Sequence, residues 1–178
     1  MVAAARAAGV TIIVDVVLNH MANLGADAEL RFPPSRAVLE RLYGASLAAL
    51  ADAPPLFGAS DFNAPFCIRN YDDPREVRFG RICGGGGDTG LPDLAQLGGD
   101  GSVRGDVLAS QLAYLRRLAE LGADGYRLDA VKHMEPSYLA RLFEALPTSP
   151  WSFGEIIVEP NRAAWDAKLE PYLQARRP

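Results

Sequence analysis

The sequence feature that most restricts the fold is a strand-like apolar run that occurs three times, each time with an acidic residue near its carboxyl end. The runs lie within Val10–Leu18, Gly122–His133 and Trp151–Val158. The acids are Asp15, Asp129 and Glu155. The first run is almost continuously apolar and β-branched, which is typical of a parallel strand covered on both faces. The fold therefore has to accommodate three strands that each bring a carboxylate with them.

Segments with apolar residues at helical spacing separate these runs. They cover 103–121, 136–146 and 161–174, and a further helix is predicted over 36–50. Strands that alternate with helices predict an α/β fold, in which parallel strands are joined by right-handed crossovers.

The connection between the first two strands is much longer than the ~30 residues of a simple strand–helix–strand unit. Residues 21–101 are rich in Pro, Gly, Asp and Asn, and the regular periodicity is mostly lost there. We therefore predict a domain inserted over 21–101 between two parts of one α/β domain, 1–20 and 102–178.

Arg127 and Asp129 are two residues apart on the second predicted strand, so their side chains point to the same face. A guanidinium close to a carboxylate stabilises the ionised form. An acid kept ionised at the end of a strand suits a nucleophile or an electrostatic stabiliser. A structural ion pair without a catalytic role is the alternative, because such pairs also perturb ionisation.

Other polar residues follow the same strands. Asp15 interrupts an apolar run, which is unfavourable unless the carboxylate meets a cation or lines a polar cavity. Asn19 and His20 come directly after that strand, and Lys132 and His133 follow the second. In an α/β barrel the carboxyl ends of the strands converge on one rim, where the chemistry takes place. Taken singly, Asn19 and His20 are equally well explained as a polar turn.

Charge and hydropathy exclude some classes of partner. The net charge is −4 at pH 7 with no basic cluster, which argues against nucleic-acid binding and against electrostatic membrane docking. No apolar run approaches the ~20 residues of a membrane span. The first residues lack the charged and apolar regions of a signal peptide.

Cys67 and Cys83 lack the spacing of a zinc site. They form a loop disulfide if the protein is exported, or remain two thiols if it is not. The glycine run 84–87 is not a phosphate loop, because no Lys-Ser/Thr pair follows it.

Four segments in order resemble motifs of the α-amylase family, glycoside hydrolase family 13. They are the DVVLNH of Asp15–His20, the LPDL of Leu91–Leu94, the GYRLDAVKH of Gly125–His133 and the FGE of Phe153–Glu155. The resemblance implies a partial (β/α)8 TIM barrel that covers the family's strands 3 to 5. By that resemblance, 1–20 is the end of helix 2 and strand 3, and 21–101 is the family's domain B. Residues 102–178 then run from helix 3 to the start of helix 5.

The resemblance also implies roles for individual residues. Asp129 resembles the nucleophile, Glu155 the general acid/base, and Arg127 the residue that orients Asp129. Positions that resemble sugar-binding residues are Asp15, His20, Lys132 and His133. The implied mechanism is retaining hydrolysis, with the two carboxyl groups about 5 to 5.5 Å apart. The apolar neighbours of Glu155 in the sequence are expected to favour its protonated form.

A structural Ca²⁺ is implied as well. Its ligands would be side-chain oxygens of Asn19 and Asp93 and the backbone carbonyl of His133, and oxygen ligands of this kind suit Ca²⁺. Asp93 is alternatively a turn residue after Pro92.

The resemblance predicts cleavage of α-1,4-glucosidic bonds in starch or related glucans. The LPDL motif resembles the amylase branch of the family more than the branch that has QPDL at the same place. Transglycosylation or isomerisation with the same acids is an alternative, and so is a glucan-binding module without catalysis.

The family's strands 1, 2 and 6 to 8, one of which carries its third catalytic Asp, are not found in the sequence. We therefore expect a fragment that is weakly active or inactive by itself. Nothing sets its oligomeric state, and an extracellular or periplasmic parent protein would agree with the family.

Overall fold

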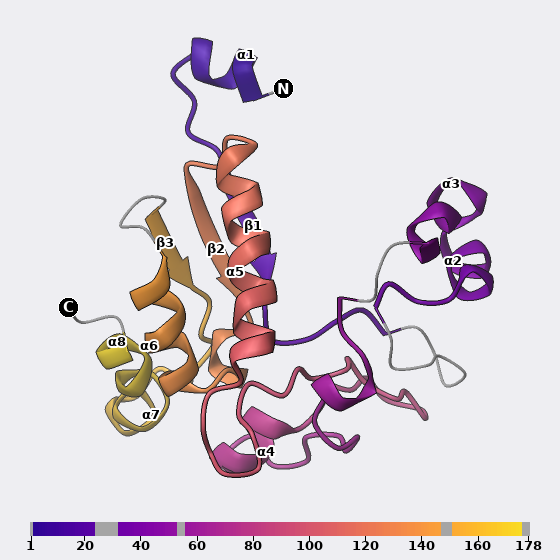
Figure 1. The fold of residues 1–178 in the computed structure, drawn as a ribbon. Helices are drawn as coiled ribbons and strands as arrows, with labels where there is room; N and C mark the ends of the chain where they lie inside the picture. Colours follow the sequence, from indigo (N-terminus) through magenta and orange to yellow (C-terminus); the bar gives the residue numbers. More distant parts are fainter. Residues whose placement is uncertain (1, 24–31, 53–55, 147–150, 176–178) are drawn as a thin grey trace. The chain divides into compact units, whose positions relative to one another are not determined.

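The computed structural model describes residues 2–23, 32–52, 56–146 and 151–175 (Figure 1). The chain divides into two compact units, one made of Met1–Asn19 and Gln96–Pro178 and the other of His20–Ala95. The domain predicted to be inserted over 21–101, with its identification as domain B, stays a prediction. Among the described residues, no helix is long and apolar enough to cross a membrane.

The first unit contains a three-stranded parallel sheet in the order β1-β2-β3. The strands are β1 (Ile13–Val17), β2 (Gly125–Asp129) and β3 (Trp151–Gly154). Their register places Asp15 opposite Arg127, and Arg127 opposite Phe153. The α/β alternation with parallel strands is thus confirmed. The first and third strands are shorter than the predicted 10–18 and 151–158.

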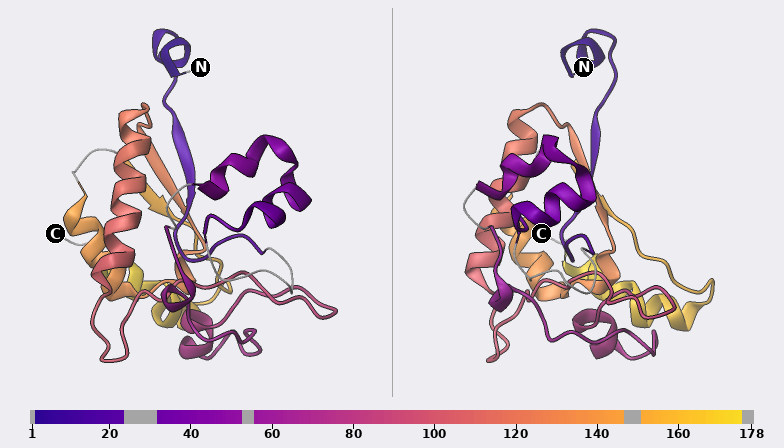
Figure 2. Two further views of the ribbon diagram at one scale, coloured as in Figure 1. Left: turned by 45° about the vertical axis from the view of Figure 1, so that its right-hand side comes forward. Right: turned by 90° about the vertical axis from the view of Figure 1, so that its right-hand side faces the viewer.

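The helices of the first unit are α1 (Val2–Ala7), α5 (Gly105–Glu120), α6 (Pro136–Ala145), α7 (Arg162–Lys168) and α8 (Glu170–Ala175). Of these, α5 and α6 lie on one face of the sheet, whereas α1 stands beyond the end of β1 (Figures 1 and 2). Figures 1 and 2 show α5 running alongside β1 and β2. The core is completed by Leu115 of α5, Leu142 of α6 and Leu128 of β2, each at most 2% exposed. This packing holds the strand ends in place.

Within the described residues of the first unit, no helix covers the other face of the sheet, which corrects the prediction that the first strand is covered on both faces. Val16 is fully buried, but Ile13 and Val17 are 44% and 43% exposed. Trp151 of β3 is 56% exposed and contacts Phe153 in a tilted arrangement, with ring centroids 5.1 Å apart. Because side chains alternate along a strand, helices on one side of the sheet can bury only every second residue.

Two predicted helices are each divided in the structure. The helix predicted over 36–50 is interrupted at Gly44, whose φ of 75° lies in the left-handed region. The helix predicted over 161–174 is divided into α7 and α8 near Leu169. Pro171 follows this break and cannot donate a backbone hydrogen bond to a continuous helix. The helical spacing of apolar residues continues across both breaks, so it did not predict them.

The second unit has short helices and irregular backbone. Its helical segments are α2 (Arg36–Tyr43), α3 (Ala45–Ala48), η1 (Ala49–Asp52), η2 (Ala59–Asp61) and α4 (Pro74–Phe79). A disulfide joins Cys67 to Cys83, whose Cα atoms are 5.6 Å apart. The Asp88 carboxylate accepts hydrogen bonds from the backbone N–H groups of Gly84 and Gly90, and these bonds lower the pKa of Asp88. The glycine run is therefore held by a neighbouring side chain.

Candidate active site

Arg127 is the centre of the candidate site, because its guanidinium pairs with three carboxylates. Its Nη1 is 2.6 Å from Asp129 Oδ1 and 2.8 Å from Asp15 Oδ1, and its Nη2 is 2.7 Å from Glu155 Oε1. Asp15, Asp129 and Glu155 come from or directly follow β1, β2 and β3 in turn. The parallel register thus brings the acids of all three strands to one cation.

The three carboxylates stabilise the positive charge of Arg127 and raise its pKa above the usual value. Hydrogen bonding to Asp15 is the largest cause, the bond to Asp129 and the charge of Glu155 add to it, and desolvation opposes it. Asp129 and Glu155 accept from different terminal nitrogens of the same guanidinium. One guanidinium therefore binds both carboxyl groups, each through a different terminal nitrogen.

The surroundings of Glu155 differ from the apolar setting expected from its sequence neighbours. Its side chain is 38% exposed and is paired with Arg127. The ion pair comes from a neighbouring strand, so adjacent residues in the sequence do not reveal it. Its backbone is held on both sides, because Glu155 N–H donates to Leu128 O at 2.9 Å and Val131 N–H donates to Glu155 O at 3.2 Å.

A tight turn follows Asp129 and carries two of the predicted sugar-contacting residues. Ala130 has a left-handed backbone, with φ of 53° and ψ of 32°. A short 3-10 helix, η3 (Val131–His133), comes next and contains Lys132 and His133. Lys132 Nζ lies 3.4 Å from Ile157 O, whereas His133 is 4% exposed. The turn therefore directs the chain away from β2 while its residues remain close to the end of the strand.

Two buried glutamines hold the segment after β1. Gln111 of α5 donates to Leu18 O at 2.7 Å and accepts from the Tyr138 hydroxyl at 3.0 Å. Gln96 donates to Asn19 Oδ1 at 3.4 Å, and its own Oε1 accepts from Glu135 N–H at 2.8 Å. Gln96 thus connects Asn19 to the backbone two residues beyond His133.

His20 and Asp93 lie in the second unit. Their backbones form an isolated antiparallel bridge. Asp93 is 1% exposed, and its Oδ2 accepts from Asn63 Nδ2 at 2.6 Å. Arg81 is also buried, and its pKa is lowered by desolvation while the charge of Asp93 opposes that effect. Asp93 is therefore a buried carboxylate with polar partners, whereas a turn residue at the surface would be exposed to solvent.

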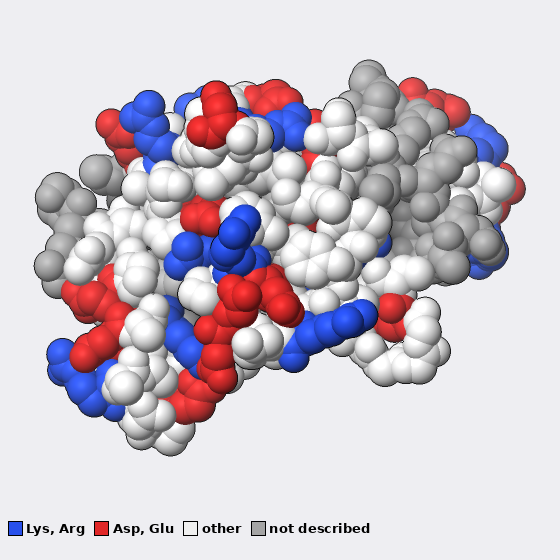
Figure 3. All heavy atoms as spheres, turned by 90° about the horizontal axis from the view of Figure 1, so that it is seen from below, with Lys and Arg blue, Asp and Glu red and all other residues white. Residues whose placement is uncertain are grey.

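The charges on the face shown in Figure 3 are mixed. Lys and Arg side chains lie among Asp and Glu side chains on that face. No broad basic area is visible on that face.

Comparison with known proteins identifies the family. The chain is 35% identical, over 97% of its length, to an α-amylase of Aeromonas hydrophila. It belongs to the α-amylase family. The chain spans 38% of the length of that α-amylase relative. No protein-family profile matches the chain.

Solved structures of α-amylases have the same fold. The structure of α-amylase I from Eisenia fetida is similar over 96% of this chain and 33% of that protein, with a TM-score of 0.63 and 25% identity. An α-amylase from Geobacillus thermoleovorans, solved with acarbose, is similar over 97% of this chain and 33% of that protein, with a TM-score of 0.55 and 18% identity. The three-stranded parallel sheet thus corresponds to part of an α-amylase TIM barrel.

Several residues around the candidate site were not predicted from the sequence. Three side chains hydrogen-bond to residues at or beside the predicted site: Gln96 to Asn19, Gln111 to the Leu18 carbonyl and Tyr172 to the Lys132 carbonyl. Gln96 comes two residues after the LPDL motif, which is the one local signal that could have drawn attention to it. Gln111 and Tyr172 lie on helices, where nothing in the local pattern marks them.

Proposed function

We propose that this chain contributes the nucleophile and the general acid/base of a retaining α-amylase-type glycoside hydrolase that cleaves α-1,4-glucosidic bonds in starch or related glucans. The observation that carries the proposal is the pairing of Arg127 with both Asp129 and Glu155. One guanidinium brings the two carboxyl groups to one site, as a pair of catalytic carboxyls requires, and the retaining outcome is inferred from the family resemblance.

In the proposed reaction, an Asp129 oxygen bonds to the anomeric carbon as the glycosidic bond breaks. The carboxylic acid of Glu155 gives its proton to the leaving oxygen. Glu155, now a carboxylate, takes a proton from water, whose oxygen bonds to the anomeric carbon and releases Asp129. Arg127 keeps Asp129 oriented and stabilises its charge between these steps. Asp15, His20, Lys132 and His133 are proposed to contact the sugar.

The test compares Glu155→Gln with Glu144→Gln in the protein that carries the complete barrel. Glu144 is a matched control, because it also pairs with an arginine, Arg141, but on the exposed surface of α6. We expect Glu155→Gln to lower kcat on soluble starch by about 10²- to 10⁴-fold, the usual contribution of a general acid. The control should leave kcat unchanged.

Product analysis on maltoheptaose separates this proposal from its alternatives. Retaining hydrolysis releases the α-anomer first, which NMR detects before mutarotation, whereas an inverting enzyme would release the β-anomer. Products longer than maltoheptaose would favour transglycosylation. Binding of maltoheptaose without turnover, unchanged by Glu155→Gln, would favour a glucan-binding module and contradict the catalytic proposal.

We further propose that the chain is a partial barrel whose insert is domain B, and that it needs further strands for full activity. The open sheet face with Ile13 and Val17 supports this. The purified chain is therefore expected to hydrolyse soluble starch weakly or not at all. Appreciable turnover that Asp129→Asn abolishes would contradict the expectation.

A structural Ca²⁺ is proposed on Asn19, Asp93 and the His133 carbonyl. Asn19 and Asp93 are each 1% exposed, and buried amide and carboxylate oxygens fit this cation. Among the described residues, no group of three or more His, Cys, Asp or Glu side chains could hold a metal, so amide and carbonyl oxygens would have to complete the site. The ion would join backbone segments and would take no part in bond cleavage.

Removing Ca²⁺ is expected to lower the thermal unfolding midpoint of the chain. After EDTA treatment, CaCl₂ at 100 times its Kd should restore about 2.7 kcal/mol of stability. Differential scanning calorimetry measures the shift, and Mg²⁺ should replace Ca²⁺ poorly because it requires a tighter octahedral shell. Asp93→Asn should abolish the shift, and Asp100→Asn, at an exposed loop carboxylate, should preserve it. Equal shifts in the two variants would rule out Asp93 as a ligand.

An extracellular or periplasmic location is proposed for the parent protein. The Cys67–Cys83 disulfide supports it, because disulfides persist mainly in oxidising compartments.

A further inference from the structure

The backbone between Ala130 and Met134 is tightly bent and needs support from outside the turn. Ala130 is the one non-glycine residue with positive φ in the described part of the chain. A left-handed residue followed by a single 3-10 turn is unfavourable unless surrounding contacts hold it. This segment presents Lys132 and His133, so its position determines where those side chains lie.

One end of the segment is fixed from the neighbouring strand. Val131 N–H donates to Glu155 O at 3.2 Å, and the Val131 side chain packs against Gly154. The other end is fixed by Tyr172 of α8. The Tyr172 hydroxyl is 2.7 Å from Lys132 O and 3.1 Å from Met134 O, the two carbonyls on either side of His133. Its single hydrogen can serve either carbonyl or be shared between them.

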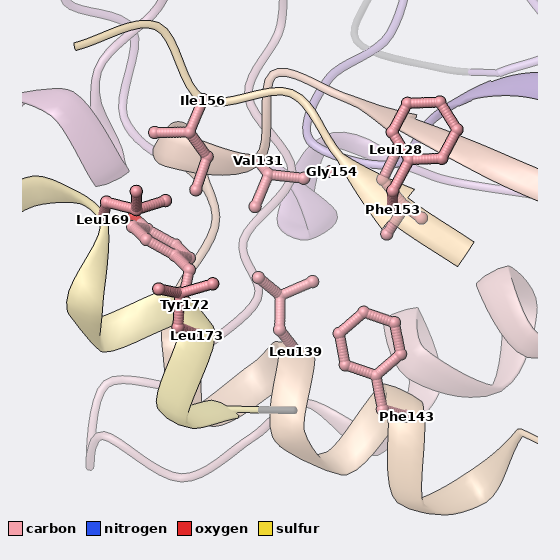
Figure 4. A pocket seen from close by; sticks show the side chains of 10 residues that line it. All are labelled: Leu128, Val131, Leu139, Phe143, Phe153, Gly154, Ile156, Leu169, Tyr172 and Leu173. Atoms are coloured by element: carbon pink, nitrogen blue, oxygen red, sulfur yellow. The ribbon is translucent and has the colours of Figure 1, made fainter. Parts of the chain in front are cut away.

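The surroundings of Tyr172 are apolar. Its ring lines a cavity of about 500 Å³ together with Val131, Leu139, Leu169 and Leu173 (Figure 4). Tyr172 is 8% exposed. A buried hydroxyl among apolar side chains is unfavourable unless it is hydrogen-bonded, and a phenylalanine would supply the same ring without that cost. The two carbonyls are therefore the structural reason for a tyrosine at this position.

We propose that Tyr172 is a positioning residue that fixes the Lys132–Met134 backbone and thereby sets the geometry of sugar contacts by Lys132 and His133. It acts through that backbone from the helix side of the sheet and does not touch the sugar. The sugar-contact part of the inference rests on the proposed glycoside hydrolase function.

The test compares Tyr172→Phe with Tyr126→Phe. Tyr126 is a matched control, because its buried hydroxyl also donates to a backbone carbonyl, Leu115 O, at 2.5 Å. Each variant keeps the ring and removes one buried hydrogen bond, so similar decreases in the unfolding midpoint are expected. Hydrogen exchange by NMR is then measured at the amides of His133 and Met134, which donate within the turn to Ala130 O and Val131 O at 3.0 and 2.9 Å.

We expect exchange at these two amides to accelerate at least fivefold in Tyr172→Phe and to stay within twofold of the wild type in Tyr126→Phe. The Kd for acarbose, measured by titration calorimetry in the protein that carries the complete barrel, should rise about 5- to 10-fold in Tyr172→Phe alone. Equal exchange in the two variants would overturn the positioning role. Faster exchange with an unchanged acarbose Kd would overturn the link to sugar contacts. Failure of the wild-type protein that carries the complete barrel to bind acarbose would instead overturn the proposed function, and the exchange rates would still decide what Tyr172 holds.

Discussion

Replacing Arg127 with methionine is expected to lower the free energy of unfolding of this chain at neutral pH and low salt. Methionine keeps much of the side-chain volume but leaves Asp15, Asp129 and Glu155 close together without a cation. Removing one partner of a fully buried ion pair costs about 3–5 kcal/mol. These groups are partly exposed, so solvent screening reduces the cost. Urea unfolding followed by circular dichroism measures the change.

Two further variants and a salt series show whether charge causes this loss. Arg127→Lys should lie between wild type and Arg127→Met, because a lysine keeps the charge but lacks the planar fork that serves several carboxylates at once. Arg117→Met breaks an exposed pair with Glu120 and should change stability by less than about 0.5 kcal/mol. The Arg127→Met deficit should shrink in 1 M NaCl, where the screening length falls to about 3 Å. A deficit that does not respond to salt would point to lost packing instead.

The same substitution should greatly reduce catalysis in the protein with the complete barrel. Loss of a preorganised charged group beside the reacting carboxylates typically lowers kcat by about 10²- to 10³-fold. Arg127→Met should therefore lower kcat on soluble starch within that range. Retention of wild-type kcat would assign Arg127 to structure alone, as in the structural ion pair that the sequence left open.

Gly154→Ala is expected to be the most disruptive one-methyl change at the candidate site. A Cβ at Gly154 would lie 2.8 Å from Val131 Cγ2, closer than side-chain atoms approach in folded proteins. Val131 is buried and β-branched, so it has few alternative rotamers. Overpacking of this kind costs about 1–3 kcal/mol. It should also move Glu155, the next residue, relative to Arg127, and the unfolding free energy and the kcat of the complete barrel should both fall.

A control and a rescue variant test the cause of the Gly154→Ala effect. Gly85→Ala adds the same methyl where no atom lies within 4 Å, so it should change stability by less than about 0.5 kcal/mol. Combining Gly154→Ala with Val131→Ala removes the clashing atoms. The two changes should be non-additive by about 0.5–3 kcal/mol. Strict additivity would show that contact with Val131 is not the source of the loss.

Parts of the fold that depend on short sequence intervals were predictable. Arg127 and Asp129 are two residues apart, so strand geometry alone places them on one face, and the structure confirms their ion pair. The α5 and α6 helices follow from apolar spacing and from stop or start residues such as Gly122 and Pro136. Helix breaks at Gly44 and near Pro171 were missed, because the apolar spacing continues across them.

The candidate site was predictable as a set of residues but not as an arrangement. Asp15 and Glu155 meet Arg127 because the β1–β2 and β2–β3 registers bring them together, and register is a property of strand pairing. Exposure of Ile13 and Val17 likewise depends on which elements cover each face of the sheet. A continuous apolar run does not reveal that by itself.

The sequence by itself determined the order of strands and helices, the acid near the end of each strand and the motifs that indicate the family, because these depend on residue type and short spacing. Only the tertiary structure decided that Arg127 serves three carboxylates, that Gly154 packs against Val131 and that Tyr172 holds the carbonyls on either side of His133. Each of these contacts joins segments that are distant in the chain, and the packing of helices and strands, which no local pattern records, brings them together.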